Sequence, residues 1–156
     1  MRLARSSNIV FSPANPESMT GLELLRHGAD DDRPSVRRLL GMRFDELEFG
    51  RVVMSVETSA DFANPLGTVH GGIAATLLDS VMSGAVHTTL AAGVSYTTLG
   101  ITIHYTRAAQ INGQRLVGTG TVVHTGRRTG TAEGRVVDEN GKLIAPGTTP
   151  CLILGG

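Results

Sequence analysis

Residues 64–83 read NPLGTVHGGIAATLLDSVMS, and this stretch decides how the chain folds. Its first part is rich in turn-forming residues, and the rest is an apolar run that begins with two glycines. From Gly71 to Ala92, Asp79 is the only side chain with a formal charge. A surface helix normally shows a charged face opposite its apolar stripe. We therefore predict a long helix covered on most sides, with a carboxylate whose burial is costly enough to suggest a function.

The composition of the chain limits the class of protein it can be. Its 156 residues are enough for one domain with a sizeable core. The formal net charge is zero, which argues against broad electrostatic binding of nucleic acid or of an anionic membrane. No segment approaches the roughly 20 apolar residues of a membrane span. The single cysteine, Cys151, excludes an internal disulfide and favours a cytoplasmic protein, and its apolar neighbours predict a buried strand thiol.

The first 41 residues differ in pattern from the rest of the chain. Residues 1–18 are rich in Ser, Asn and Pro and are predicted to form an arm. Short helices are predicted at residues 20–27 and 35–40, the second of them stopped by Gly41. The acidic run at residues 30–32 is expected to be a solvated loop or a helix cap, because no further ligand is spaced to complete a metal site.

Periodicity outside the long helix predicts β-structure. Strands are expected at residues 42–49, 51–59, 98–107, 114–125, 129–138 and 143–154. The first two strands are joined at Gly50, and the last two by an Asn-Gly turn that ends at Gly141, a strong hairpin signal. In the last strand, Pro146 and Pro150 imply a bulge or an edge position.

This order of elements predicts an α+β fold in which an antiparallel sheet wraps around one long central helix. The helix is expected to begin at the two glycines and to end near Gly93. The four strands that follow it can form a meander. One curved sheet cannot cover a helix with so little charge on all sides, so the remaining cover would have to come from a second subunit.

The start of the helix is the first candidate for chemistry. The opening N–H groups of a helix have no internal partner, and Gly71 and Gly72 leave them open to close approach by a ligand carbonyl. Such groups stabilise an oxygen that gains negative charge during acyl transfer. The same glycines can also serve only as a tight turn. His70 can orient a carbonyl or cap the loop, and Asn64 can position a water or begin the turn before Pro65.

Asp79 is the second candidate, eight residues past Gly71. Thr76 and Ser83 share its helix face at i−3 and i+4. Burial would raise the pKa of Asp79 and make it a better base or nucleophile. The alternative is a carboxylate that points to water beside small hydroxyls. No metal site is expected, because the histidines after the helix start are too far apart in sequence to form one: His87, His104 and His124.

Together these residues resemble the hotdog-fold acyl-CoA thioesterases of the phenylacetate-degradation (PaaI-like) type. The resemblance covers residues 20–154. The family pattern on the loop and central helix is matched by Asn64, Gly67, His70-Gly71-Gly72 and Asp79. The runs HTGRR at residues 124–128 and DENGK at residues 138–142 are also similar to this family. The division that follows is an N-terminal arm with short helices at residues 1–41 and a hotdog thioesterase domain at residues 42–156.

The resemblance implies a reaction and a site. Asp79 would be the catalytic carboxylate, acting as nucleophile or as base for the hydrolytic water. The N–H of Gly71 would polarise the thioester carbonyl, with His70, Asn64 and Ser83 assisting. No metal or cofactor is implied, because CoA is part of the substrate. The residues implied to hold the nucleotide part of CoA are Tyr105, Thr106, Arg107, Gly126, Arg127 and Arg128.

The resemblance also implies an oligomer. In such enzymes the carboxylate and the Gly-Gly helix start of one site come from different subunits. A homodimer is then the minimum, and a homotetramer built as a dimer of dimers is expected.

The acyl group and two alternative functions stay open at this point. Related aromatic-acyl thioesterases often carry Glu at the position of Asp79, and with four Phe, two Tyr and no Trp an aryl-stacking pocket is not obvious. Short or branched acyl groups are therefore also open. The alternatives are an enoyl-CoA hydratase or dehydratase of the same fold, which the His70-to-Asp79 spacing does not favour, and a non-catalytic acyl-CoA-binding protein.

Overall fold

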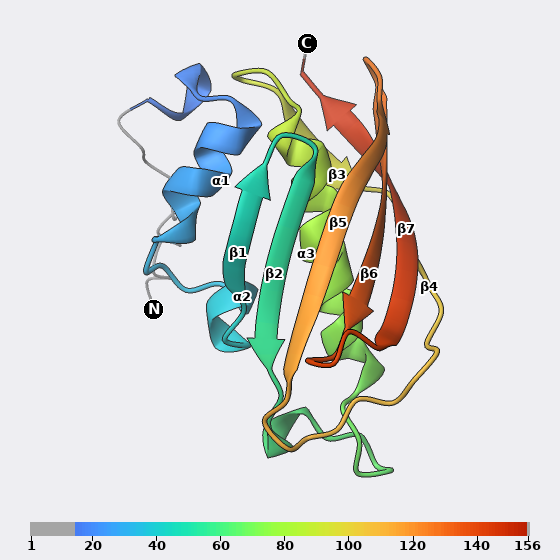
Figure 1. The fold of residues 1–156 in the computed structure, drawn as a ribbon. Coiled ribbons are helices and arrows are strands. Elements are labelled where there is room, and N and C mark those ends of the chain that lie inside the picture. Colours follow the sequence, from blue (N-terminus) through green and yellow to red (C-terminus); the bar gives the residue numbers. More distant parts are fainter. Residues whose placement is uncertain (1–14, 156) are drawn as a thin grey trace, which may run out of the picture.

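A curved antiparallel sheet packed on one long helix forms the body of the protein. The computed structural model describes residues 15–155. The helix is α3 (Gly71–Thr88), and the seven strands of the sheet run in the order β1-β2-β5-β6-β7-β3, with β4 also paired to β7. Figure 1 shows α3 behind the sheet and α1 beside β1. The strands are β1 (Arg43–Glu48), β2 (Arg51–Glu57), β3 (Ser95–Thr98), β4 (Thr102–Ile103), β5 (Arg115–Thr125), β6 (Thr129–Val137) and β7 (Leu143–Leu154). The predicted α+β arrangement is confirmed.

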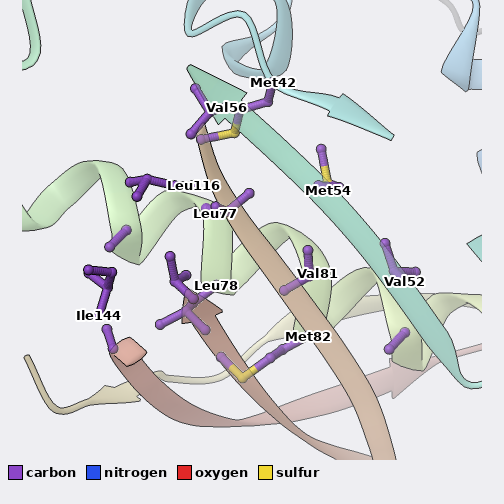
Figure 2. Close-up of a cluster of buried hydrophobic side chains, with 14 of the residues drawn as sticks. Met42, Val52, Met54, Val56, Leu77, Leu78, Val81, Met82, Leu116 and Ile144 are labelled. Atoms are coloured by element: carbon purple, nitrogen blue, oxygen red, sulfur yellow. The ribbon is translucent and has the colours of Figure 1, made fainter. Parts of the chain in front are cut away.

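The core lies between α3 and the inner face of the sheet (Figure 2). The fully buried apolar side chains of α3 include Leu77, Leu78, Val81 and Met82. Each such side chain contributes roughly 1.5–3 kcal/mol relative to leaving it exposed. The helix can lie this close because β5 has glycine at the contact. A Cβ atom on Gly120 would lie only 2.2 Å from the carbonyl oxygen of Val81.

The N-terminal helices form as predicted, and α1 packs on α3 and β1. Helix α1 (Gly21–Ala29) begins with a capping box, in which Thr20 and Glu23 bond reciprocally. Helix α2 (Val36–Leu39) is capped by Ser35, and single-turn 3-10 helices lie at Pro16–Ser18 and Ala60–Phe62. In the acidic loop, Asp31 pairs with Arg33 and Asp32 pairs with Arg38. Residues 1–14 of the predicted arm lie outside the described residues.

The long helix ends earlier than predicted, at Thr88 and not near Gly93. The hydroxyls of Thr88 and Thr89 donate to the carbonyls of Ala85 and Val86, at 2.6 and 2.7 Å. Thr88 Oγ1 also accepts a hydrogen bond from the backbone N–H of Gly50 at 2.7 Å. The backbone N–H groups of Thr89 and Leu90 bond to the carbonyls three residues back, each at 3.0 Å, so the helix closes in a tightened last turn.

The strand predicted at residues 98–107 is wrong, because only Thr98, the last residue of β3, and the two residues of β4 are in strands there. Both strands pair with β7, where the backbone N–H groups of Leu99 and His104 donate to Pro150 and Pro146. Proline has no N–H to return these bonds, so the ladder is interrupted. Strand β7 lies inside the sheet, so of the two predicted alternatives, a bulge or an edge position, the structure shows the bulge. A register shift relative to β6 falls between Ala145 and Leu143, close to Pro146.

The predicted four-strand meander holds only for β5, β6 and β7. Strand β3 pairs with β7 at the far edge of the sheet, and β5 pairs with β2. The chain therefore crosses from the edge formed by β3 and β4 to the middle of the sheet before β5 begins. The two β-hairpins at Gly50 and Gly141 form as predicted.

Candidate functional site

Asp79 lies on α3, opposite the edge strand β3. Its side chain is half-buried in the single chain. The hydroxyl of Thr98 donates a hydrogen bond to Asp79 Oδ1 at 3.1 Å. This bond orients the carboxylate and uses only one of its two oxygens. Sequence reasoning missed Thr98, because the contact depends on β3 passing beside α3.

The two hydroxyl residues that share the helix face of Asp79, Thr76 and Ser83, bond to the backbone of α3. Ser83 Oγ donates to the backbone oxygen of Asp79 at 2.6 Å, and Thr76 Oγ1 donates to the backbone oxygen of Gly72 at 2.8 Å. Both hydroxyls thus satisfy carbonyls of their own helix. Ser83 also lies within 3.5 Å of the Tyr96 hydroxyl, a long contact, and Tyr96 is a second residue that sequence reasoning missed. Burial raises the pKa of Tyr96, which keeps its hydroxyl neutral.

His70 forms the N-cap of α3. Its Nδ1 accepts a hydrogen bond from the backbone N–H of Gly72 at 2.9 Å. In the neutral ring the proton must then be on Nε2, so the exposed edge of the imidazole is a hydrogen-bond donor. Capping, one of its two predicted roles, is therefore seen. The N–H of Gly71 is among those that the helix leaves without an internal partner.

Tyr105 and Asn64 shape the surroundings of this helix start. The Tyr105 hydroxyl donates to the backbone oxygen of Gly71 at 3.1 Å, and a Cβ atom on Gly71 would lie 3.0 Å from the Tyr105 ring. Asn64 uses its side chain within its own loop: its Oδ1 accepts from the N–H groups of Leu66 and Thr68, at 2.9 and 3.1 Å. The structure thus shows the turn-forming role predicted as one alternative for Asn64.

The residues expected to hold CoA fall into two groups at opposite ends of α3. Tyr105 contacts the first residue of the helix, and the Thr106 hydroxyl donates to backbone oxygens of residues 143 and 144. Gly126, Arg127 and Arg128 form the β5–β6 turn, which adjoins the other end of α3 through a 3.0 Å contact between the hydroxyls of Thr125 and Thr89. The 18 residues of α3 correspond to about 27 Å. One chain therefore does not bring the two groups together.

Gly71 and Asp79 are also separated within one chain. Eight residues along an α-helix correspond to about 12 Å. One thioester carbonyl cannot contact both the N–H of Gly71 and the carboxylate of Asp79 across that distance.

Within residues 15–155, no three His, Cys, Asp or Glu side chains are grouped so that they could hold a metal ion. In the same part of the chain, no helix has the length and apolar character needed to cross a membrane. Cys151 is buried in β7, as predicted, and burial raises the pKa of its thiol.

Comparison with known families decides the identity of this arrangement. The family model described as the thioesterase superfamily matches residues 66–145, which is just over half of the chain. The chain belongs to the thioesterase superfamily. The matched region contains the helix start, all of α3, strands β3 to β6 and the first three residues of β7. The predicted PaaI-like hotdog resemblance is confirmed.

Solved structures agree with this assignment. A mutant of the phenylacetic acid degradation protein PaaI from Thermus thermophilus is 32% identical, with a TM-score of 0.68 over 74% of this chain and 96% of that one. A phenylacetic acid degradation-related protein from Ralstonia eutropha is 28% identical, with a TM-score of 0.74 over 85% and 99%. E. coli PaaI, at 22% identity, shares the fold with a TM-score of 0.78 over 87% and 95%. A comparison with curated proteins gave no match.

Proposed function

We propose that this member of the thioesterase superfamily is an acyl-CoA thioesterase that hydrolyses a thioester to a carboxylic acid and free CoA. The observation that carries the proposal is the Asp79 carboxylate, oriented by Thr98 through one oxygen on a helix that begins with two glycines. Asp79 is the catalytic carboxylate, and the backbone N–H of Gly71 polarises the carbonyl. His70, Asn64 and Ser83 assist by shaping the helix start and the surroundings of the carboxylate.

The reaction follows from these groups. Asp79 takes a proton from a water molecule, whose oxygen attacks the thioester carbon, or the carboxylate attacks that carbon itself and water then cleaves the anhydride. In both routes the negative charge on the former carbonyl oxygen is stabilised by the N–H of Gly71. The carbon–sulfur bond then breaks, and the CoA thiolate leaves and takes up a proton; in the second route this step forms the anhydride, which water cleaves afterwards. No step needs a metal or a cofactor besides the CoA of the substrate.

A second copy of the chain completes the site in this proposal. The separation of about 12 Å between Gly71 and Asp79 on one helix supports a site that combines Asp79 of one subunit with Gly71 of another. The two groups of CoA-binding candidates, also separated in one chain, would meet in the same way. A homodimer is the minimum assembly, and a homotetramer of paired dimers is the expected one.

The Asp79→Asn variant tests the proposed reaction. It retains the size and the hydrogen-bonding shape of the side chain but removes the base and nucleophile. We expect thiol release from every active acyl-CoA to fall by at least about 100-fold, while circular dichroism and the oligomeric state stay unchanged. Ser80→Ala is the matched control, because Ser80 is the next residue and its hydroxyl bonds only to the backbone of Thr76 among the contacts described.

Near-native turnover of Asp79→Asn would refute the assignment. A screen of aromatic, short, medium and long acyl-CoAs, together with an enoyl-CoA hydration assay, also separates the alternatives. Hydration without thiol release would indicate a hydratase, and tight binding without either reaction would indicate a binding protein.

A further inference from the structure

A cavity of about 440 Å³ lies between α1, α2, β1 and the C-terminal half of α3. Its walls are mainly apolar and include Leu24, Leu25, Phe44 and the imidazole of His87. Volume and lining are typical of sites that bind small apolar ligands. The proposed reaction does not use this cavity, so its role needs a separate explanation.

The charged groups around this cavity are engaged with one another. Asp31 is paired with Arg33, whose hydrogen bonds lower the pKa of Asp31 to about 2. Arg37 donates to the backbone oxygen of Asp31 at 3.1 Å and lies over the ring of Phe44, 5.6 Å from its centroid. Burial lowers the pKa of His87, which keeps the ring uncharged at neutral pH. What the cavity offers a ligand is therefore mainly apolar surface.

A continuous row of contacts connects the Asp79 region to this cavity. Ser83 bonds to the backbone of Asp79, and the Tyr96 hydroxyl lies 3.5 Å from Ser83 Oγ. The ring of Tyr96 in turn contacts that of His87, with 5.0 Å between centroids, and His87 lines the cavity. Asp79 and His87 are eight residues apart on α3. This corresponds to about 12 Å, the extended length of a chain of roughly ten carbon atoms.

A second cavity on the molecule is more polar. A cavity of about 780 Å³ lies on the sheet, where polar side chains that include Arg51, Glu133 and Arg135 stand beside apolar ones such as Val137 and Leu143. No residue of α3 lines it. An apolar acyl chain whose thioester lies at Asp79 would therefore be buried in the cavity of about 440 Å³ between α1, α2, β1 and α3.

We propose that the cavity between α1, α2, β1 and α3 receives the distal end of the acyl group, and that the substrates are acyl-CoAs with aliphatic chains of about ten carbons or more. This inference rests on the proposed thioesterase function and specifies its substrate class. Acetyl and propionyl groups are too short to reach from Asp79 to His87. Longer chains gain affinity by burying methylene groups among Leu24, Leu25 and Phe44.

Gly28 offers a way to fill the cavity without changing the reacting groups. It lines the cavity, and a Cβ atom added to it would meet nothing within 4 Å. Gly28→Phe fills the space, and Gly28→Ala is the matched control with almost no added volume. Both residues have a higher helix propensity than glycine, so α1 should form in both variants.

The experiment uses the Asp79→Asn protein and measures, by calorimetry, the binding of acetyl-CoA and of dodecanoyl-CoA. Dodecanoyl-CoA is kept below its critical micelle concentration. We expect dodecanoyl-CoA to bind at least about tenfold more tightly, and this ratio to persist with Gly28→Ala and to fall to about twofold or less with Gly28→Phe. Equal affinities for the two ligands, or a ratio that survives Gly28→Phe, would overturn the inference. Thiol release by the wild-type enzyme is measured separately, so a failure of the thioesterase proposal is distinguished from a failure of this one.

Discussion

The hydroxyl of Thr98 has a specific consequence for Asp79. By donating to Oδ1 at 3.1 Å, it fixes the rotation of the carboxylate. The second oxygen, Oδ2, is then the one that can face a water molecule or a thioester carbon. Thr98 is thus a positioning residue in the proposed mechanism.

Replacing Thr98 separates positioning from substrate binding. Thr98→Val preserves the branched shape but removes the hydrogen bond, and we expect kcat to fall about tenfold with a smaller change in KM. Thr98→Ser should restore most of kcat, because it returns the donor. Steady-state thiol-release kinetics measure both parameters, with the exposed neighbour Thr97→Val as control. A wild-type kcat in Thr98→Val, or no recovery in Thr98→Ser, would exclude the positioning role.

At the scale of elements, the decisive contact is the close approach of α3 to β5. It depends on Gly120, which faces the backbone of Val81 and Met82. An added methyl group would meet backbone atoms of the helix, which cannot move aside as a side-chain tip can. This close packing of α3 on β5 fixes the position of the helix, and with it the positions of Asp79 and of the helix start.

We predict that Gly120→Ala lowers the free energy of unfolding by about 3 kcal/mol, because α3 must shift away from the sheet. Urea unfolding at one fixed protein concentration measures the change, since subunit association also affects stability. Gly100→Ala is the control: its Cβ would meet nothing within 4 Å, so we expect a change below about 0.5 kcal/mol. Equal stability of the two variants would show that the packing of α3 against β5 is not close at Gly120.

At the scale of the whole molecule, the separation of Gly71 from Asp79 makes the subunit arrangement testable. Gly71→Pro removes the N–H at the first helical position, where proline is well tolerated, and the backbone of His70 is already extended as a residue before proline requires. Gly71→Ala adds a similar bulk beside Tyr105 but retains the N–H. We expect Gly71→Pro to be inactive and Gly71→Ala to retain more activity.

Co-expression of Gly71→Pro with Asp79→Asn should restore activity if sites are shared between subunits. A mixed dimer then has one site with both native groups, so random mixing returns roughly a quarter of the native activity. Differently tagged chains allow the mixed dimer to be purified and assayed for thiol release. If each chain held a complete site, the mixed dimer would stay inactive, and the shared-site proposal would be rejected.

Local patterns predicted much of this fold. The start of α3 at Gly71, the hairpins at Gly50 and Gly141, and the short helix α1 all depend on a few neighbouring residues. Such features follow from backbone conformation and from orphan N–H groups, which short stretches of sequence control. The division of the chain at residue 41 into arm and domain stays a prediction.

What the sequence by itself determined is the central helix, its glycine start and its single carboxylate, because helix periodicity and charge patterning are local. Only the tertiary structure decided that β3 pairs with β7, that Thr98 bonds to Asp79 across 19 residues, and that α1 encloses an apolar cavity beside His87. These contacts join distant segments through packing and hydrogen bonds that no local pattern encodes. The prolines of β7 show the difference. They interrupt the hydrogen bonds to β3 and β4, and only the order of the strands in the sheet identifies these as the neighbours of β7.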